Sequence, residues 1–475
     1  MRADPRLVSA QGGFQSLRRD LASRRDGHGA VRPGAGRRRR LAALALLVLV
    51  AALGCGAEKT ARPPDLILIS IDTLRADRLG CYGHPLPTSP EIDRLRAGAV
   101  LFREAIAQAP STLASHASML TSVPPVRLGA SFARRRALPE SAVTVAEVLQ
   151  AAGYRTMALT AAGQLAREFG IGQGFEVYRP RSERQQAGAF WPRVGAALSL
   201  LEAPDPRPVF LFLHTYEVHH PYRPDPATLA KFDPGYRGGL GERIPVGLIE
   251  GINRGEIAID AADLRHIERA YEAEIVSVDR AVGRLLDWLA ASERFRDAVV
   301  VVTSDHGEEF GEHGKVGWHS HTLYDELLRV PLLIRLPGGE AAGGEVTLPV
   351  RLLDLAPTLL ELAGVEAPPE FEGRSLLPLV RGTATRELAA LASLDDGSDA
   401  SHALRLGGWK LWDGRLFDLA SDPGERIDRA PDHPARAAVL QRMLAAELER
   451  RFAGEAPAAE IDAAAEQELR ALGYL

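Results

Sequence analysis

Between residues 65 and 380, short apolar runs alternate with segments whose apolar residues recur at helical spacing. Parallel strands that are buried on both faces are apolar throughout, and helical crossovers connect them. Strands are therefore predicted at 66–71, 156–160, 209–214, 298–304 and 330–335, and helices at 141–152 and 267–289. The pattern predicts an α/β fold with a mostly parallel sheet that is flanked by helices.

The pattern changes after residue 380, where shorter apolar segments follow one another. Strands are predicted at 388–394, 403–406 and 410–417, with a closing helix at 435–453. We therefore expect a large domain over residues 65–380 and a small C-terminal α+β subdomain over residues 381–475. Two segments rich in Arg, Pro and Gly are predicted to be surface insertions that shape a pocket, at 180–208 and 223–262.

The composition narrows the class of protein. The chain has 475 residues, of which 46% are hydrophobic and 25% are charged, and its net charge is −5. These values are ordinary for a soluble globular protein, and the modest negative charge gives no reason to expect a nucleic-acid partner. The two cysteines, Cys55 and Cys81, do not provide a disulfide framework or a metal-binding cysteine motif. The sequence leaves the oligomeric state open.

The N-terminal segment has the pattern of a targeting sequence. Four arginines at 37–40 precede an apolar stretch at 41–53, which ends in Gly54-Cys55. This order predicts a signal peptide within residues 37–57. Export would make the protein periplasmic or, with Cys55 lipidated as in a lipobox, a membrane-anchored lipoprotein that touches the membrane only through its N-terminal anchor. An uncleaved anchor helix is the alternative. Residues 1–36 are predicted to be a disordered or mis-started extension.

Polar side chains follow two of the predicted strands at the point where each strand ends. Asp72 follows the run at 66–71, and Asp305 and His306 follow the run at 298–304. The carboxyl ends of parallel strands share one edge of a sheet, where ligands bind in open α/β folds. A single Asp at a strand end is more often a helix N-cap, but two such ends and a histidine favour a metal site. Imidazole among oxygen ligands favours Mn²⁺ or Zn²⁺, with Ca²⁺ kept open.

Hydroxyl and imidazole groups gather in three further segments. Thr112 and His116 lie at the expected start of a helix, where the positive end of the helix dipole favours an anionic ester. A Ser/Thr-rich capping segment is the alternative reading of that stretch. Four further candidate histidines lie at or beyond the ends of the runs at 209–214 and 298–304, and are His214, His219, His319 and His321. Their positions after strands predict one shared cleft.

Taken in order, these motifs resemble those of the sulfatase family of the alkaline phosphatase superfamily. The resemblance rests on the opening segment 72–83, the His-x-Pro-Tyr segment 219–222, the Asp-His-containing segment 304–314, and the segments 324–331 and 416–424. It implies an alkaline-phosphatase-like fold, with a sulfatase-like catalytic domain over residues 65–380 and the C-terminal subdomain after it. It also implies a metal-dependent hydrolase of sulfuric or phosphoric esters.

The segment around Thr112 departs from the family's pattern. A sulfatase nucleophile lies in Cys/Ser-x-Pro-x-Arg and is oxidised to formylglycine, and this pattern occurs nowhere in the chain. Alignment of Leu120-Thr121 with the residues after the family's nucleophile puts Thr112 at its position, Ala114 at the proline and His116 at the arginine. Threonine cannot yield the aldehyde, so turnover requires a covalent ester on Thr112 that water displaces.

The sequence therefore suggests a mechanism with one divalent metal and four ligands, namely Asp72, Thr112, Asp305 and His306. The Thr112 oxygen is expected to attack sulfur or phosphorus in line. His116 and His219 are expected to stabilise charged oxygens or position the substrate. His321 or His319 is expected to protonate the leaving group or ligate a second metal. His214 and His319 are the expected substrate-binding residues.

Three functions remain compatible with the sequence. The first is hydrolysis of a small-molecule, glycan or lipid-headgroup ester, and the Thr112 nucleophile favours phosphate over sulfate. The second is phosphotransfer by the same site. The third is a catalytically inactive exported protein that binds anionic glycan or lipid headgroups, in which the altered nucleophile segment would have no chemical role.

Overall fold

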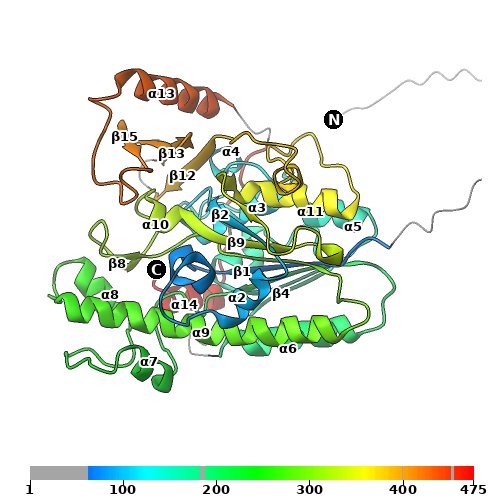
Figure 1. Ribbon diagram of the computed structural model, residues 1–475, viewed down its shortest axis with the longest axis horizontal. Coiled ribbons are helices and arrows are strands. Elements are labelled where there is room, and N and C mark those ends of the chain that lie inside the picture. The colour runs from blue at the N-terminus through cyan, green and yellow to red at the C-terminus, as the bar shows by residue number, and fades with distance from the viewer. Residues whose placement is uncertain (1–61, 182–187, 398–399, 451–453, 475) are drawn as a thin grey trace, which may run out of the picture. The chain divides into compact units, whose positions relative to one another are not determined.

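The computed structural model describes residues 62–181, 188–397, 400–450 and 454–474 (Figure 1). The predicted N-terminal extension (1–36) and signal peptide (37–57), with Cys55, lie outside these residues. Within the described ranges, none of the helices combines the length and the apolar character that a bilayer crossing requires.

A mostly parallel sheet forms the centre of the described structure. Its strands run in the order β10 (Glu345–Val346), β2 (Val100–Ile106), β9 (Arg329–Arg335), β6 (Val299–Thr303), β1 (Leu66–Ile71), β5 (Val209–Thr215), β3 (Arg155–Ala161) and β4 (Val177–Arg181), and β11 (Val350–Arg351) also pairs with β2. All of these pairs are parallel except those of β9, which runs antiparallel to both β2 and β6. The predicted fold class is confirmed.

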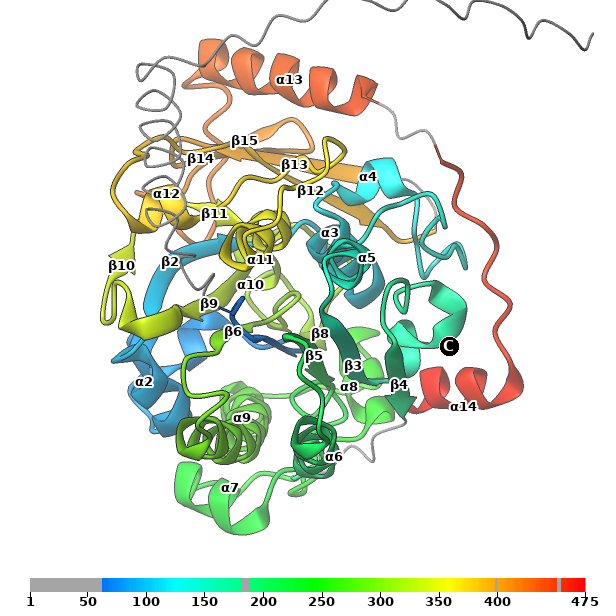
Figure 2. The same cartoon turned by 90° about the vertical axis from the view of Figure 1, so that its right-hand side faces the viewer.

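Helices cover both faces of this sheet, as Figure 2 shows. On one face lie α2 (Pro90–Arg96), α6 (Phe190–Glu202), α7 (Pro226–Phe232), α8 (Val246–Asn253) and α9 (Ala261–Ala291). On the other lie α3 (Thr112–Thr121), α5 (Val145–Ala151) and α11 (Leu355–Ala363). Side chains of β1 alternate between these layers, because Ile67 and Ile69 pack in the first core and Leu66 and Leu68 in the second. Burial on both faces explains why β1 is apolar throughout.

The segment predicted as an insertion at 180–208 contains a buried helix instead. Phe190, Val194 and Leu201 of α6 are buried in the core that α9 shares. Their spacing of four and seven residues places them on one face of the helix, with Arg and Pro residues around them. The segment at 223–262 is also partly helical, because it contains α7 and α8.

A second, antiparallel sheet follows in sequence. It runs in chain order through β12 (Ala390–Asp395), β13 (Ala400–Leu406), β14 (Trp409–Trp412) and β15 (Arg415–Asp418), and α13 (Pro434–Glu449) packs on it. The segment 410–417, predicted as one strand, is a hairpin that turns at Asp413 and Gly414, both with positive φ. The expected C-terminal subdomain is therefore present, while its boundary at residue 380 stays a prediction. Shorter elements are α4 (Pro125–Leu128), β7 (Glu309–Phe310), β8 (Val316–Trp318), α10 (Asp325–Leu328), α12 (Leu377–Val380) and α14 (Ala463–Ala471).

A buried lysine joins the two sheets. Lys410 of β14 is 1% exposed, and its Nζ lies 2.9 Å from Asp325 Oδ1 of α10 and 2.7 Å from Glu425 Oε1. Arg405 of β13 also contacts Asp325, at 2.7 Å. Burial acts to lower the pKa of Lys410, but the two carboxylates outweigh it and raise that pKa. The C-terminal sheet is thus fixed to α10, which directly precedes β9 of the central sheet.

Replacing Lys410 by Ala should lower the free energy of unfolding by about 3–5 kcal/mol, because buried carboxylates would lose their counter-charge. Urea unfolding followed by circular dichroism measures the change. Lys231→Ala, at an exposed lysine of α7, is the control and should change stability by less than about 0.5 kcal/mol. Equal stability of Lys410→Ala and the control would contradict the structural role given to this ion pair.

Candidate active site

The strand register brings the two predicted metal-binding segments to the same height. β1 and β6 are adjacent and parallel, and Ser70 pairs with Thr303, so Asp72 and Asp305 each lie two residues beyond a matched pair. The candidate ligand atoms of Asp72, Asp305 and His306 all lie within 4.8 Å of one another, and these side chains are fully buried. The parallel register is therefore what assembles this group.

Thr112 completes the group from the other side. It is the first residue of α3, and its Oγ1 lies 3.1 Å from Asp72 Oδ2 and 3.5 Å from His306 Nε2. Ser115, one turn later, donates a hydrogen bond of 2.7 Å to the backbone carbonyl of Asp305. This bond fixes the start of α3 against the end of β6. The four residues predicted to share a metal are thus brought together.

Backbone hydrogen bonds hold the strand ends in place. The Asp72 N–H donates to Thr215 O at 3.1 Å, and the Leu74 N–H donates to Ser304 Oγ at 2.9 Å. Ser304 Oγ in turn donates to His306 O at 2.7 Å. These bonds connect the ends of β1, β5 and β6, so the ligand positions do not depend on a mobile loop.

Three of the four carboxylate oxygens of Asp72 and Asp305 lack a hydrogen bond within the described residues. Asp72 Oδ1 and both oxygens of Asp305 are buried without a hydrogen bond from any described residue. Burial raises the pKa of Asp72 well above its usual value, and the negative charge of Asp305 raises it further. Buried, unpaired carboxylates are costly unless a cation neutralises them. Two carboxylates, an imidazole and a hydroxyl are a donor set that fits a divalent metal.

His116 and His214 lie beneath this group rather than in an open cleft. His116 Nδ1 donates to Thr112 O at 2.8 Å, and its Nε2 lies 2.9 Å from Ser70 Oγ. His214 Nε2 lies 3.2 Å from Asp72 Oδ2. Both rings are fully buried, and burial lowers the pKa of each. Their contacts suit the positioning of Thr112 and Asp72, and the catalytic role predicted for His116 and the substrate-binding role predicted for His214 stay predictions.

A second group of imidazoles lies beside Thr112. It consists of His219, His220 and His319, whose candidate ligand atoms also lie within 4.8 Å of one another. His219 and His319 were predicted from the sequence, whereas His220 was not singled out. His321 is placed elsewhere: its Nε2 lies 2.7 Å from Glu309 Oε2, and among the described contacts none joins it to Thr112. The role predicted for His321 therefore rests on the sequence alone.

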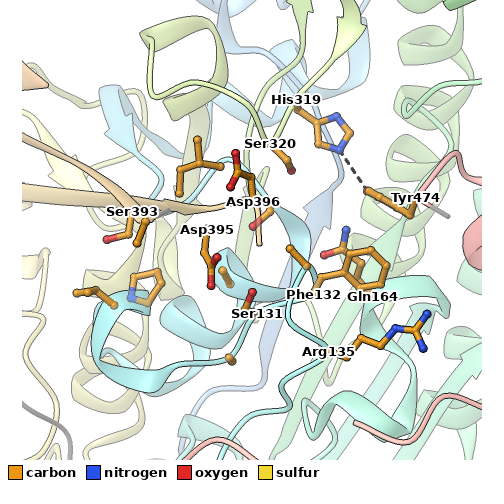
Figure 3. Close-up of a pocket in the computed structure, with 18 of the residues that line it drawn as sticks. Ser131, Phe132, Arg135, Gln164, His319, Ser320, Ser393, Asp395, Asp396 and Tyr474 are labelled. Carbon is orange, nitrogen blue, oxygen red and sulfur yellow. Dashed lines mark hydrogen bonds between the residues drawn. The ribbon is translucent and has the colours of Figure 1, made fainter. Parts of the chain in front are cut away.

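Tyr474 is a site residue that the sequence did not reveal. Its hydroxyl lies 3.3 Å from His319 Nε2, as Figure 3 shows. The same hydroxyl lies 2.8 Å from His219 Nε2 and 3.4 Å from Thr112 Oγ1. It reaches the site from the segment after α14, 362 residues beyond Thr112 in sequence. No motif surrounds it, so only the fold shows that it belongs here.

A cavity of about 500 Å³ opens beside Tyr474 and His319. Its walls include Gln164 and Ser320 of the large domain and Asp395 and Asp396 near the end of β12, as Figure 3 shows. His402 of β13 also lines it. This volume suits a small ligand or one or two sugar residues. Tyr474 both lines the cavity and contacts Thr112. A ligand in the cavity would therefore have to pass the Tyr474 phenol to reach the Thr112 hydroxyl.

The sulfatase family model matches residues 64–365, which is more than half of the chain. The chain belongs to the sulfatase family. The match covers β1, α3 and β6, and therefore Asp72, Thr112, Asp305 and His306. The family expected from the motifs is confirmed.

Individual relatives are distant. The ulvan-active sulfatase of Formosa agariphila is 27% identical over 352 residues, which are 67% of this chain and 65% of that protein, so the chain spans just under two thirds of its length. A protein solved in complex with its substrate D-glucosamine-2-N,6-O-disulfate is 20% identical and has a TM-score of 0.68, over 82% of this chain and 98% of that one. The phosphonate monoester hydrolase of Agrobacterium radiobacter is 19% identical with the same TM-score, over 81% and 95%. These structures share the fold.

A divalent cation should stabilise the folded chain, because it would neutralise Asp72 and Asp305. At a free Mn²⁺ concentration about 100 times its dissociation constant, the gain is about 2.7 kcal/mol. Unfolding curves with Mn²⁺ and with a chelator measure it. The variant Asp72→Asn/Asp305→Asn should lose the stabilisation that comes from a cation bound at these two carboxylates. An equal gain in wild type and variant would show that the cation binds elsewhere.

Proposed function

We propose that this chain is a metal-dependent hydrolase of sulfuric or phosphoric esters, with the Thr112 hydroxyl as its nucleophile. The observation that carries the proposal is the position of Thr112 Oγ1, 3.1 Å from Asp72 Oδ2 and beside His306 at the start of a helix. Membership of the sulfatase family supports ester hydrolysis as the reaction. Asp72, Thr112, Asp305 and His306 would hold the metal, with Mn²⁺ or Zn²⁺ favoured by the imidazole ligand.

The proposed reaction begins at the Thr112 hydroxyl. A bound divalent cation would supply positive charge that favours loss of the Thr112 proton. Asp72 Oδ2 accepts the hydrogen bond of the Thr112 hydroxyl and so orients this hydroxyl. The Thr112 oxygen attacks sulfur or phosphorus, the bond to the leaving alcohol breaks, and a proton passes to that alcohol. Water then attacks the sulfur or phosphorus of the ester on Thr112, so that sulfate or phosphate leaves and a proton from the water returns to the Thr112 oxygen.

The start of α3 contributes to binding of the anion. Thr112 lies at the N-terminal end of a ten-residue helix, where free N–H groups and the helix dipole favour negative charge. One of these N–H groups, that of Leu113, already donates to Gln164 Oε1 at 3.0 Å. Gln164 lines the cavity, so its side chain links the ligand space to the nucleophile's own turn.

The cavity and one structural neighbour support a proposal for the substrate class. Asp395 and His402 of the C-terminal sheet and Asp396, which directly follows β12, line the same cavity as His220 and His319. Such a wall suits hydrogen bonds to the hydroxyls of a sugar, and sulfated sugars are bound by one structural neighbour. We therefore propose a glycan or another polyhydroxylated ester as the substrate.

Thr112→Ala should lower turnover by about a thousandfold or more, because the covalent step would lose its nucleophile. Aryl sulfate, phosphate monoester, phosphate diester and phosphonate monoester substrates, each tested with Mn²⁺, Zn²⁺ and Ca²⁺, measure the rate. Thr112→Ser should retain turnover, since it keeps the hydroxyl. Rapid acid quench followed by mass spectrometry should find the sulfuryl or phosphoryl group on Thr112.

Thr121→Ala is the matched control, because it makes the same change at the other end of α3, where the hydroxyl only donates to Ala117 O. It should keep activity within about twofold of wild type. Wild-type rates in Thr112→Ala would show that another group attacks. Absence of turnover on every ester, together with tight binding of a sulfated glycan, would favour the catalytically inactive binding protein.

A further inference from the structure

Specific hydrogen-bond contacts orient two rings of the imidazole group, which consists of His219, His220 and His319. His219 Nδ1 contacts the backbone carbonyl of His220, and His319 Nδ1 lies 2.8 Å from Glu308 Oε1. Because Nδ1 of His219 and of His319 is used in these contacts, Nε2 of each ring is left to contact another group. In both cases Nε2 faces the Tyr474 hydroxyl, at 2.8 and 3.3 Å. Two rings are thus oriented so that their free nitrogens approach one oxygen.

The third ring lacks any hydrogen-bond partner. His220 is 2% exposed, and neither of its ring nitrogens bonds to a described residue. A Cβ placed on Gly473 would lie 3.1 Å from His220 Nε2, so this nitrogen faces the same segment of chain as the other two. Trp318 stacks on the ring at 5.4 Å and fixes its plane. A buried imidazole nitrogen without a partner is costly unless a ligand satisfies it.

The carboxylate of Glu308 lies beside the Nδ1 atoms of two of these rings. Glu308 Oε1 contacts His319 Nδ1, while Glu308 Oε2 lies 3.6 Å from His220 Nδ1 and accepts a hydrogen bond of 3.2 Å from Tyr222. Metal-binding histidines commonly donate their second ring nitrogen to a carboxylate, which orients the ring and increases its basicity. Glu308 occupies that position for His319 and approaches it for His220.

We propose that His219, His220 and His319 form a second divalent-cation site, separate from the group of Asp72, Asp305 and His306. Three imidazoles without a carboxylate ligand select zinc over calcium or magnesium. The Tyr474 hydroxyl supplies an oxygen beside two of the nitrogens, which gives the four donors that zinc usually takes. The two sites adjoin, because the rings of His306 and His319 lie 4.6 Å apart.

The position of this site determines which ester the protein would prefer, a consequence that rests on the proposed function. The Tyr474 hydroxyl, which lies beside two of the three imidazoles, is 3.4 Å from Thr112 Oγ1. A cation in each site would add positive charge near the Thr112 oxygen, where negative charge develops on the ester during the reaction. A phosphate monoester has close to two negative charges at neutral pH, about one more than a sulfate monoester. The paired sites therefore favour phosphate monoesters.

Metal content of the whole chain tests the site directly. The protein is incubated with Zn²⁺, freed of excess by gel filtration, and analysed by inductively coupled plasma mass spectrometry. We expect two zinc ions per chain in wild type and one in His219→Ala/His319→Ala. Asp72→Asn/Asp305→Asn should also bind one. His433→Ala, at an exposed histidine, should bind two and controls for adventitious binding.

A titration of wild type alone guards against a variant that does not fold. Co²⁺ added to the metal-free chain should give visible absorption that saturates at two equivalents. Saturation at one equivalent, or two zinc ions retained in His219→Ala/His319→Ala, would overturn the proposal. One ion with intact hydrolysis would leave the proposed function standing without the second site. Two ions without hydrolysis would support the second site and refute the proposed function.

Activity ratios test the substrate preference. In His219→Ala/His319→Ala, hydrolysis of a phosphate monoester should fall about tenfold more than hydrolysis of a sulfate ester, because the more highly charged ester loses more neutralisation. An equal fall for both esters would contradict the proposed preference.

Discussion

Two buried carboxylates at the end of adjacent strands are the constraint around which this structure is arranged. Asp72 and Asp305 come together because β1 and β6 pair in parallel with matched register. Their repulsion works against folding, and it is acceptable only where a cation can offset it. The serines that bond the backbone beside them, Ser115 and Ser304, keep the carboxylates from turning away. The fold thus maintains an arrangement whose energetic cost the cation of the proposed function would offset.

The strands at the centre of the sheet could be predicted because burial on both faces makes them continuously apolar. β1 begins and ends where its apolar run does, and β5 and β6 differ from their predicted ranges by only one residue at either end. β2 was missed because Arg103 and Glu104 interrupt its run, at the point where the pairing with β9 is irregular. The sequence also did not predict that β9 is antiparallel to its neighbours, because an apolar run has the same pattern in a parallel and in an antiparallel strand.

In the candidate site too, some residues could be predicted from the local sequence, and others depend on contacts that only the folded chain provides. Asp72, Asp305 and His306 could be predicted because each follows a clear strand, and strand ends share an edge. His319 and His321 are two residues apart, and the sequence could not decide between them, because the loop around Ser320 has no regular period that would orient one of them inward. Only the folded chain distinguishes His319, which contacts Glu308, from His321, which contacts Glu309.

The distance along the chain between Thr112 and Tyr474 has a consequence for biosynthesis. The central sheet is complete once β11 has been made, but the phenol that contacts the Thr112 oxygen arrives more than a hundred residues later. A nascent chain on the ribosome can therefore assemble its sheet and gather Asp72, Thr112 and Asp305 before Tyr474 has been added. Until residues 463–474 emerge and dock, the imidazoles of His219 and His319 stay without their hydroxyl partner, so the site matures only as translation of this region finishes.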